Sequence, residues 1–372
     1  MDVLEYSEEE LNNLSVNELE LLLSEAEVKE RMYLTEQIGL KIIINSLYGA
    51  LANKWFPLFN EKMAQAITGN GRFFIRLLAK NIESRLQSMN KLENDSYMVY
   101  SDTDSVYYHI EPFMNMFIEK NPDSTISEQT DFADEFEKKV IAPIIQGTID
   151  ELARKLNLFN PSVVGASREI IADSAVFVQK KKYFARVRDD EGHRYPEHSP
   201  DIKIMGLDII KSSTPIWSKE KLLDSIGHIL DKDEQDLRNW LQKTKSDYLE
   251  ANIADLVQHG GVNNLDYVLG EKGVPFGSRT ALVHNQYITD NNLTDMYSLI
   301  DAGDKTKRVF LRMPNKFNSN AISFTNDSFI KEFEHCIDYD MMFEKGFLSA
   351  LENMTNTLNY NLRKETETLD DW

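Results

Sequence analysis

A long proline-free stretch with helical periodicity constrains the fold more than any other feature of this sequence. No proline occurs before Pro57, and apolar residues recur at helical spacing from Leu19 to Leu51. Two segments fit the capping-box pattern that begins helices, Ser7-Glu8-Glu9-Glu10 and Ser15-Val16-Asn17-Glu18. We therefore predict one long helix from about Val16 to about Ala52, roughly 55 Å in length.

The second half of this predicted helix carries a polar stripe. Lys41, Asn45 and Tyr48 follow one another at four and three residues, so a cation, an amide and a phenol share one face. An apolar stripe lies beside it, formed by Leu40, Ile44, Leu47 and Leu51. The polar stripe could bind a nucleoside triphosphate, with Lys41 as a point charge on phosphate oxygens. A solvated face opposite a core face would give the same pattern.

Two β-prone runs between Tyr97 and Ile110 flank a short Ser-Asp-Thr-Asp turn, which predicts a hairpin with Asp102 and Asp104 at its tip. If the backbone there is near-extended, both carboxylates leave on the same face and can converge on one hard cation. The alternative is that these aspartates only cap backbone groups in a tight turn.

Length and composition set broad limits. The 372 residues can form two or three domains, and no apolar run approaches the 18 to 20 residues of a membrane span. The N-terminus has no signal core, so we expect no membrane association and a cytoplasmic location. The single cysteine, Cys336, excludes an internal disulfide, and a plain buried thiol is favoured over a nucleophile paired with His335.

The charge is uneven along the chain. The formal net charge is −20, and residues 1–30 supply −9 of it, with ten acids against Lys29. This balance argues against non-specific coating of DNA by the whole surface, but it leaves room for a local basic track.

One such track is Lys180-Lys181-Lys182-Tyr183-Phe184-Ala185-Arg186-Val187-Arg188, with five basic residues, two aromatic residues and no acid. As an alternating strand it would present cations along a phosphate backbone. An exposed edge strand protected by lysines is the alternative interpretation.

The remaining elements follow from periodicity and turn residues. Residues 113–130 show no clear period and are predicted to be loop, and Pro143 is predicted to interrupt the helix that follows. The predicted helices cover residues 61–89, 132–158, 219–230, 234–248 and 338–362, and a strand is predicted at residues 308–312.

The two polar motifs together resemble a known family. Lys41-x-x-x-Asn45-Ser46-x-Tyr48-Gly49, followed by Tyr100-Ser101-Asp102-Thr103-Asp104-Ser105, is similar in order and spacing to two polymerase motifs of family B DNA polymerases, with T-even-like phages as the nearest likeness. The basic track resembles the Lys-Lys-Arg-Tyr segment of that family, with Lys182 in place of the arginine. Ser101 stands where the family usually has glycine.

The resemblance implies an α+β fold, a fragment of a right-hand polymerase with an antiparallel palm sheet, a helical fingers arm and a mainly helical thumb. Residues 1–53 would be the C-terminal half of the fingers, 54–206 the C-terminal part of the palm, and 207–372 the thumb. The stretch from Asp201 to Pro215 resembles the crossing from palm to thumb.

The resemblance also implies roles for residues. Asp104 would be an essential catalytic ligand of two Mg²⁺ ions, with Asp102 secondary, while Lys41, Asn45 and Tyr48 would bind the incoming dNTP. The residues implied to hold primer-template DNA are Lys180, Lys181, Lys182, Tyr183, Lys203 and Lys211. In the phage family a short C-terminal peptide docks on the sliding clamp, and here Leu369 and Trp372 are the matching apolar pair.

The family's first palm motif, Asp-x-x-Ser-Leu-Tyr-Pro, and its exonuclease signature are not found in this sequence. The resemblance therefore implies a DNA-directed DNA polymerase subunit that is active only with a partner chain supplying the exonuclease and the other palm aspartate. A fragment of a longer polypeptide is the alternative to a split polymerase.

Three other functions stay open. The first is a non-catalytic DNA- and clamp-binding module of a replication complex. A reverse-transcriptase-like palm fits less well, because it uses adjacent aspartates. The last is an acidic α+β protein with coincidental motifs.

Overall fold

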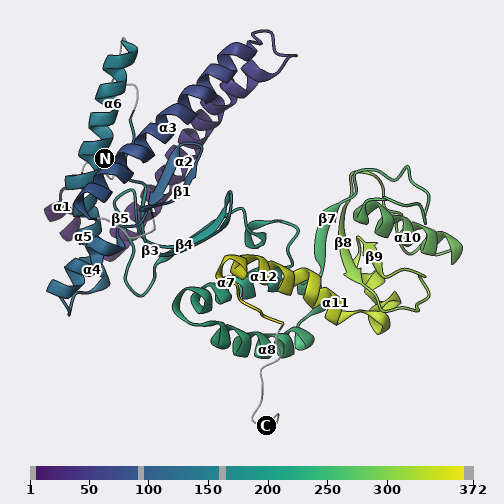
Figure 1. The fold of residues 1–372 in the computed structure, drawn as a ribbon. Coiled ribbons are helices and arrows are strands. Elements are labelled where there is room, and N and C mark those ends of the chain that lie inside the picture. The colour runs from purple at the N-terminus through teal and green to yellow at the C-terminus, as the bar shows by residue number, and fades with distance from the viewer. Residues whose placement is uncertain (1–5, 91–95, 159–164, 364–372) are drawn as a thin grey trace. The chain divides into compact units, whose positions relative to one another are not determined.

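The computed structural model describes residues 6–90, 96–158 and 165–363. The structure is α+β, as predicted, with antiparallel sheets and many helices (Figure 1). The chain forms two compact units, unit 1 with residues 1–109 and 144–161, and unit 2 with residues 110–143 and 162–372. This division does not test the assignment of residues 1–53, 54–206 and 207–372 to fingers, palm and thumb, which stays a prediction.

Unit 1 begins with helix α1 (Glu8–Asn12) and the 37-residue helix α2 (Val16–Ala52). Both predicted capping boxes are confirmed. At α2 the backbone N–H and the hydroxyl of Ser15 both donate to Glu18 Oε2, at 2.8 and 2.6 Å. These bonds fix the start of α2 at the predicted residue.

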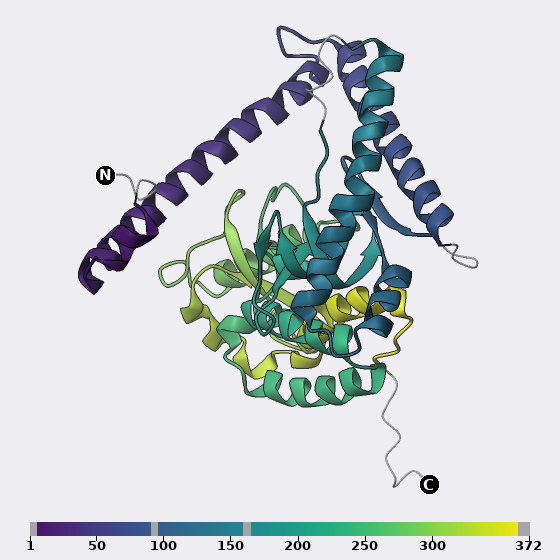
Figure 2. The same ribbon diagram turned by 90° about the vertical axis from the view of Figure 1, so that its left-hand side faces the viewer.

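Helix α2 has no buried side chain. Leu40, Ile44 and Leu47 of its apolar stripe are 55%, 69% and 56% exposed, so this stripe does not form the core face that the alternative interpretation required. The helix turns into α3 (Glu61–Met89), and Figure 2 shows the two helices diverging from that turn. Helix α2 is thus an arm whose apolar surface is open.

Helix α3 has the predicted bounds, and it buries one face. The buried side chains are Ala64, Ile75, Leu78, Ala79, Ile82 and Leu86, whereas Phe73 is 55% exposed. Helix α6 (Ala142–Leu156) contributes to the same unit, and Asn81 Nδ2 of α3 donates to Thr148 Oγ1 at 2.9 Å. The hairpin of β1 (Met98–Asp102) and β2 (Ser105–Tyr108) follows α3, and β2 contacts that helix.

The predicted loop at residues 113–130 is wrong for most of its length. The structure has α4 (Glu111–Lys120) and α5 (Ile126–Phe136) there, joined by a short turn. Pro112 in the first turn of α4 and a capping box between Thr125 and Glu128 begin these helices. Both signals were present in the sequence and were outweighed by its mixed polar composition.

The predicted interruption near Pro143 takes the form of a π-helical turn that separates two α-helices. The π-helical segment η2 (Glu137–Ile141) joins α5 to α6, and Ala142 N–H donates to Glu137 O, five residues back. A proline ring clashes with the carbonyl four residues back and donates no hydrogen bond. Widening the turn just before Pro143 therefore lets the helix continue.

Unit 2 contains two antiparallel sheets. In the first, β4 (Lys182–Asp190) pairs with β3 (Ile170–Gln179), with β5 (His193–Arg194) and with β6 (Asp201–Met205). The second has the order β7 (Gln258–Gly261), β8 (Lys305–Phe310) and β9 (Ala321–Phe324). Helix α10 (Phe276–Asp290) packs against the second sheet (Figure 1).

Helices connect and cover these sheets. The predicted helices near residues 219–230 and 234–248 are confirmed as α7 (Ile216–Asp231) and α8 (Glu234–Glu250). The predicted final helix is present as several consecutive helical segments, and short helices fill the links. Their bounds are η4 (Asp208–Ile210), α9 (Ile253–Leu256), η5 (Asp327–Glu332), η6 (Glu334–Cys336), α11 (Tyr339–Phe343), η7 (Glu344–Leu348), α12 (Ser349–Thr355) and η8 (Asn356–Leu358).

One hydrophobic cluster runs from the first sheet of unit 2 through the helices to the second sheet. Trp217 of α7 lies at its centre and meets Tyr248 and Phe347 edge-on, with ring centroids 4.8 and 5.4 Å apart. Cys336 is buried there, as predicted, and burial raises the pKa of its thiol. This continuous core is what makes unit 2 a single packed body.

Candidate functional site

The predicted hairpin is confirmed, with its two aspartates at the tip. Strands β1 and β2 are antiparallel, and Asp102 pairs with Ser105 across a two-residue turn. The backbone is not near-extended there, because Thr103 has a φ of +23°. Strand alternation therefore cannot place both carboxylates on one face. The prediction that they converge on one cation required a near-extended backbone, which the turn does not have.

The two carboxylates have different surroundings. Asp102 is partly buried, and its Oδ1 accepts hydrogen bonds from the backbone N–H and the hydroxyl of Thr103, at 2.9 and 3.1 Å. Asp104 is exposed at the turn. Asp102 is thus partly engaged in holding the turn, while Asp104 presents its carboxylate to solvent, as a ligand for a hard cation requires.

Glu83 anchors the hairpin and was missed in the sequence analysis. Its carboxylate on α3 accepts the backbone N–H groups of Tyr97 and Met98, at 3.2 and 3.0 Å. Tyr97 is fully buried, and its ring stacks on His109 with centroids 5.6 Å apart. The start of β1 and the end of β2 are therefore fixed to α3, which positions the tip.

The polar stripe of α2 is present as a geometric feature. Lys41, Asn45 and Tyr48 all lie on α2 and are exposed, so they are accessible to a ligand. Tyr48 is 47% exposed. The structure does not test their predicted role in binding a nucleotide.

The basic track is divided by a turn. Lys180 and Lys181 form the turn between β3 and β4, and Lys181 has a φ of +62°. Lys182 begins β4, and the ring of Tyr183 is buried against Phe177, with centroids 5.3 Å apart. Lys180, Lys181 and Lys182 therefore lie together at the tip of the β3–β4 hairpin, and the buried ring of Tyr183 anchors the start of β4.

The two arginines of the track do not extend it. Arg186 Nε and Arg188 Nε donate to the two carboxylate oxygens of Asp173, at 2.8 and 2.7 Å. Arg186 also donates to Asp231, and Arg188 is only 7% exposed. The expectation of cations along the whole strand is wrong, because these two cations are neutralised inside the unit.

Lys203 and Lys211 are also paired. Lys203 of β6 forms an ion pair with Glu169, and Lys211 pairs with Asp208 at 2.5 Å. Burial opposes the charged form of Lys203, but the hydrogen bond and charge of Glu169 outweigh it and raise its pKa. The predicted DNA-binding roles of both lysines remain untested.

The structure gathers no larger ligand set at the aspartates. Within the described ranges, no group of three or more His, Cys, Asp or Glu residues is arranged to hold a metal ion. In the same residues no helix is long and apolar enough to cross a membrane. Leu369 and Trp372, the predicted clamp-binding pair, lie outside the described residues.

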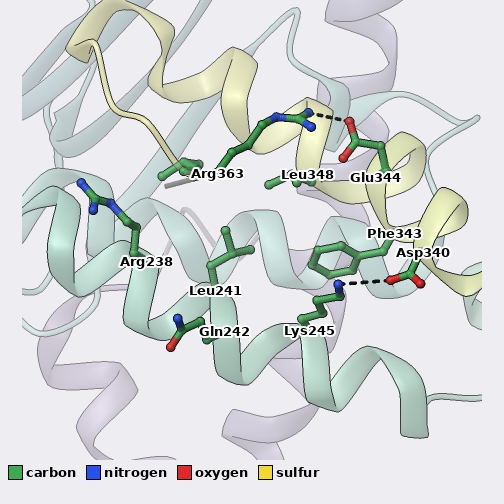
Figure 3. A pocket seen from close by; sticks show the side chains of 10 residues that line it. Arg238, Leu241, Gln242, Lys245, Asp340, Phe343, Glu344, Leu348 and Arg363 are labelled. Atoms are coloured by element: carbon green, nitrogen blue, oxygen red, sulfur yellow. Dashed lines mark hydrogen bonds and ion pairs between the residues drawn. The ribbon is translucent and has the colours of Figure 1, made fainter. Parts of the chain in front are cut away.

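A pocket of about 310 Å³ lies elsewhere, between α8 and the α11–η7 segment (Figure 3). Leu241 and Phe343 form an apolar floor, and Lys245 pairs with Asp340 at 3.1 Å on its rim. The pocket contains none of the predicted site residues, so the predicted chemistry belongs to open surfaces and not to this hollow.

Comparison with known proteins shows which proteins this chain is similar to. The model of the family described as DNA polymerase family B matches residues 18–140. That range includes the stripe on α2 and the aspartate hairpin, the two features that carried the resemblance.

The chain is 28% identical to the DNA-directed DNA polymerases of Escherichia phage RB69 and Enterobacteria phage T4, over 97% and 93% of its own length. It is also 34% identical over 70 residues to the DNA polymerase delta catalytic subunit of Drosophila melanogaster. The predicted resemblance to family B DNA polymerases of T-even-like phages is therefore confirmed. The aligned part covers 41% and 39% of the two phage polymerases, so this chain spans about two fifths of these relatives.

Proposed function

We propose that this chain is the C-terminal part of a DNA-directed DNA polymerase that transfers nucleotides to a primer 3′ end during phage DNA replication. The observation that carries the proposal is the similarity of nearly the whole chain to two phage DNA polymerases, with Lys41, Asn45, Tyr48, Asp102 and Asp104 all present in the two motifs. In the reaction the primer 3′ oxygen bonds to the α-phosphorus of a dNTP, pyrophosphate leaves, and the hydroxyl loses its proton.

The hairpin tip carries carboxylates, which are the type of donor that a magnesium site requires. Asp104 offers an exposed carboxylate, and Asp102 offers a second beside it. Two Mg²⁺ ions bound there would lower the pKa of the attacking hydroxyl and neutralise the charge of the leaving group. Asp104 would hold the metal directly, and Asp102 would stabilise the turn and act as a secondary ligand.

A third carboxylate would come from a partner. No metal-holding cluster exists within the described residues, and the first palm motif is not found in the sequence. We propose that an N-terminal polymerase chain or segment supplies that aspartate together with the exonuclease, and that the assembly works in the host cytoplasm.

The other predicted residues have separate tasks in this scheme. Lys41 and Asn45 would hold the triphosphate, with Tyr48 packing on the nascent base pair. Lys180, Lys181 and Lys182 would contact the primer-template backbone from the tip of the β3–β4 hairpin. The pair Leu369 and Trp372 would dock on a sliding clamp.

Primer extension by the reconstituted polymerase tests the role of Asp104. With the partner polypeptide present, Asp104→Ala should lower the rate of nucleotide addition at least about a hundredfold, because a metal ligand acts on the chemical step. Asp123→Ala is the matched control, since Asp123 is an exposed turn aspartate of unit 2. Unimpaired synthesis by Asp104→Ala would remove this residue from the mechanism.

The second candidate is a non-catalytic DNA- and clamp-binding module. The basic tip at Lys180–Lys182 favours it, because DNA binding there requires no metal. In that case the Asp104→Ala assembly and the wild-type assembly would bind DNA equally, and neither would extend a primer.

A further inference from the structure

Arg308 of β8 is a part-buried cation without a carboxylate partner among the described residues. Five other arginines of unit 2 that are buried or part-buried form an ion pair with a carboxylate, whereas Arg279 shares with Arg308 the lack of one among the described residues. The five paired arginines are Arg168, Arg186, Arg188, Arg194 and Arg238.

Two glycines make room for this guanidinium. A Cβ atom added to Gly260 would lie 2.4 Å from Arg308 Nη1, and one added to Gly277 would lie 2.5 Å from Nη2. Both approaches are too close for a real side chain, so the guanidinium lies directly against the backbone of β7 and α10. Such close seating removes water from the cation, and burial lowers its pKa.

The hydrogen-bonding capacity of Arg308 is mostly unused in the described part of the chain. Nη2 donates to Gly261 O at 2.7 Å. Nε is buried and has no partner, whereas Nη1 has no partner and is not sealed from solvent. An incoming acceptor can therefore reach the guanidinium on one side.

The position of Arg308 also places it at a helix start. Gly277 is the second residue of α10, and the N-cap residue Pro275 supplies no side-chain cap. The N-terminal end of a helix carries partial positive charge and free N–H groups. The guanidinium is repelled by the positive end of the helix. A bound anion would be attracted to the guanidinium and to the N-terminal end of the helix together.

The surrounding segment reverses the charge of the chain. Residues 258–324 contain seven basic and six acidic residues, a net charge of +1, whereas the chain carries −20. Arg279, on the first turns of α10, stacks 5.4 Å over Phe276 and donates to the amide oxygen of Asn320 at 2.9 Å. The guanidinium of Arg279 thus has a neutral hydrogen-bond partner.

We propose that Arg308, together with the first turn of α10, binds a phosphodiester group of nucleic acid. The inference rests on the proposed function, which requires unit 2 to hold DNA despite its acidic surroundings. A guanidinium open on one side matches the oxygens of a phosphate, and backbone phosphates are present in any DNA sequence. The site therefore contributes affinity without sequence specificity.

Salt-dependent DNA binding tests the site. Binding of the full 372-residue chain to a fluorescent primer-template duplex is measured by anisotropy at several salt concentrations. Arg308→Met should weaken binding about five- to tenfold at about 0.1 M salt and reduce the slope of log K against log salt by about 0.9, the value for one phosphate. Arg363→Met is the matched control, because Arg363 is already paired with Glu344 and Glu352.

A second variant separates charge from structure. Arg308→Lys keeps the charge and loses the fork geometry, so it should retain the wild-type salt slope even if its melting temperature falls. Equal slopes for wild type and Arg308→Met, or a slope for Arg308→Lys as low as that of Arg308→Met, would overturn the proposal. A site for free phosphate would also overturn the proposal. It would be indicated if inorganic phosphate raised the melting temperature of the wild type and not of Arg308→Met, while both proteins had the same salt slope for DNA.

The DNA-binding result is independent of catalysis. Primer extension by the reconstituted assembly reports on the proposed function, and the salt slope reports on Arg308. A chain that extends primers with unchanged slopes would therefore refute this site alone, whereas a chain that binds no DNA would refute both.

Discussion

At the scale of single residues, His284 on α10 makes the stability of unit 2 depend on pH. His284 is 2% exposed, its Nε2 lies 3.2 Å from Ser298 O, and its Nδ1 has no partner within the described residues. Burial lowers the pKa of its imidazole below the ordinary value of 6.5, although backbone hydrogen bonds oppose the shift. The folded protein therefore binds this proton less readily than the unfolded chain does.

The sign of the effect follows from linkage. The unfolded chain binds more protons at His284, so the free energy of unfolding should rise as the pH approaches 6.5 from below. The contribution is complete above pH 6.5 and is lost as the pH falls towards the folded pKa. His284→Gln should flatten this part of the profile in urea denaturation, whereas His198→Gln, at an exposed turn, should not. A profile unchanged by His284→Gln would contradict the prediction.

The candidate site shows which residue-level features a sequence reveals. Asp102, Asp104 and the stripe at Lys41 were found because their spacing is local. The positive φ at Thr103 could not be found, since positive φ is rare outside glycine and Ser101 replaced the expected glycine. Glu83 was missed because its partners Tyr97 and Met98 are 14 and 15 residues away and only the fold brings them together.

At the scale of elements, the accuracy of the predictions followed the strength of local signals. Helices α2 and α3 have the predicted bounds because no proline interrupts them and polar caps begin them. The short helices α4 and α5 were missed because ten or eleven residues give few apolar repeats. The basic strand β4 was found, but its pairing with acidic residues depends on tertiary contacts.

The close contact between Gly206 and the turn of the β3–β4 hairpin gives a prediction at the scale of elements. Gly206 follows β6 with a φ of +64°, and a Cβ atom there would lie 2.1 Å from the backbone oxygen of Lys181. Gly206→Ala should therefore lower the free energy of unfolding by about 1–3 kcal/mol, because it combines backbone strain with a clash against the hairpin turn.

A second glycine provides the control. Gly192 has a φ of +97°, and no atom lies within 4 Å of its added Cβ, so Gly192→Ala introduces the strain without the clash. An alanine tolerates a φ of +64° better than one of +97°, so a larger loss of stability in Gly206→Ala than in Gly192→Ala, measured by urea denaturation, reports the clash. If Gly206→Ala destabilises the protein no more than Gly192→Ala does, the hairpin is not seated as described. Displacement of Lys180 and Lys181 in Gly206→Ala should also weaken DNA binding.

At the scale of the whole molecule, the open apolar surface of α2 is the feature that most directly supports the proposed partner polypeptide. Ile42, Ile43 and Ile44 are 60%, 69% and 69% exposed, and the helix buries none of its 37 residues. An isolated helix gains little stability without tertiary packing, and apolar area exposed on this scale is typical of an interface. The occupant we propose is the fingers helix of the partner polypeptide, which also carries the missing palm aspartate.

Hydrogen exchange measures this coupling between the chain and its partner. Amides of residues 16–52 should exchange rapidly in the free chain, because few tertiary contacts oppose local unfolding of α2. Adding the partner should slow them by at least about tenfold, since covering the apolar stripe makes opening of the helix more costly. Amides of α10, which is packed on its own sheet, serve as the internal reference and should not change. Equal protection of α2 with and without a bound partner would show that this arm is stable alone and that its apolar surface serves another purpose.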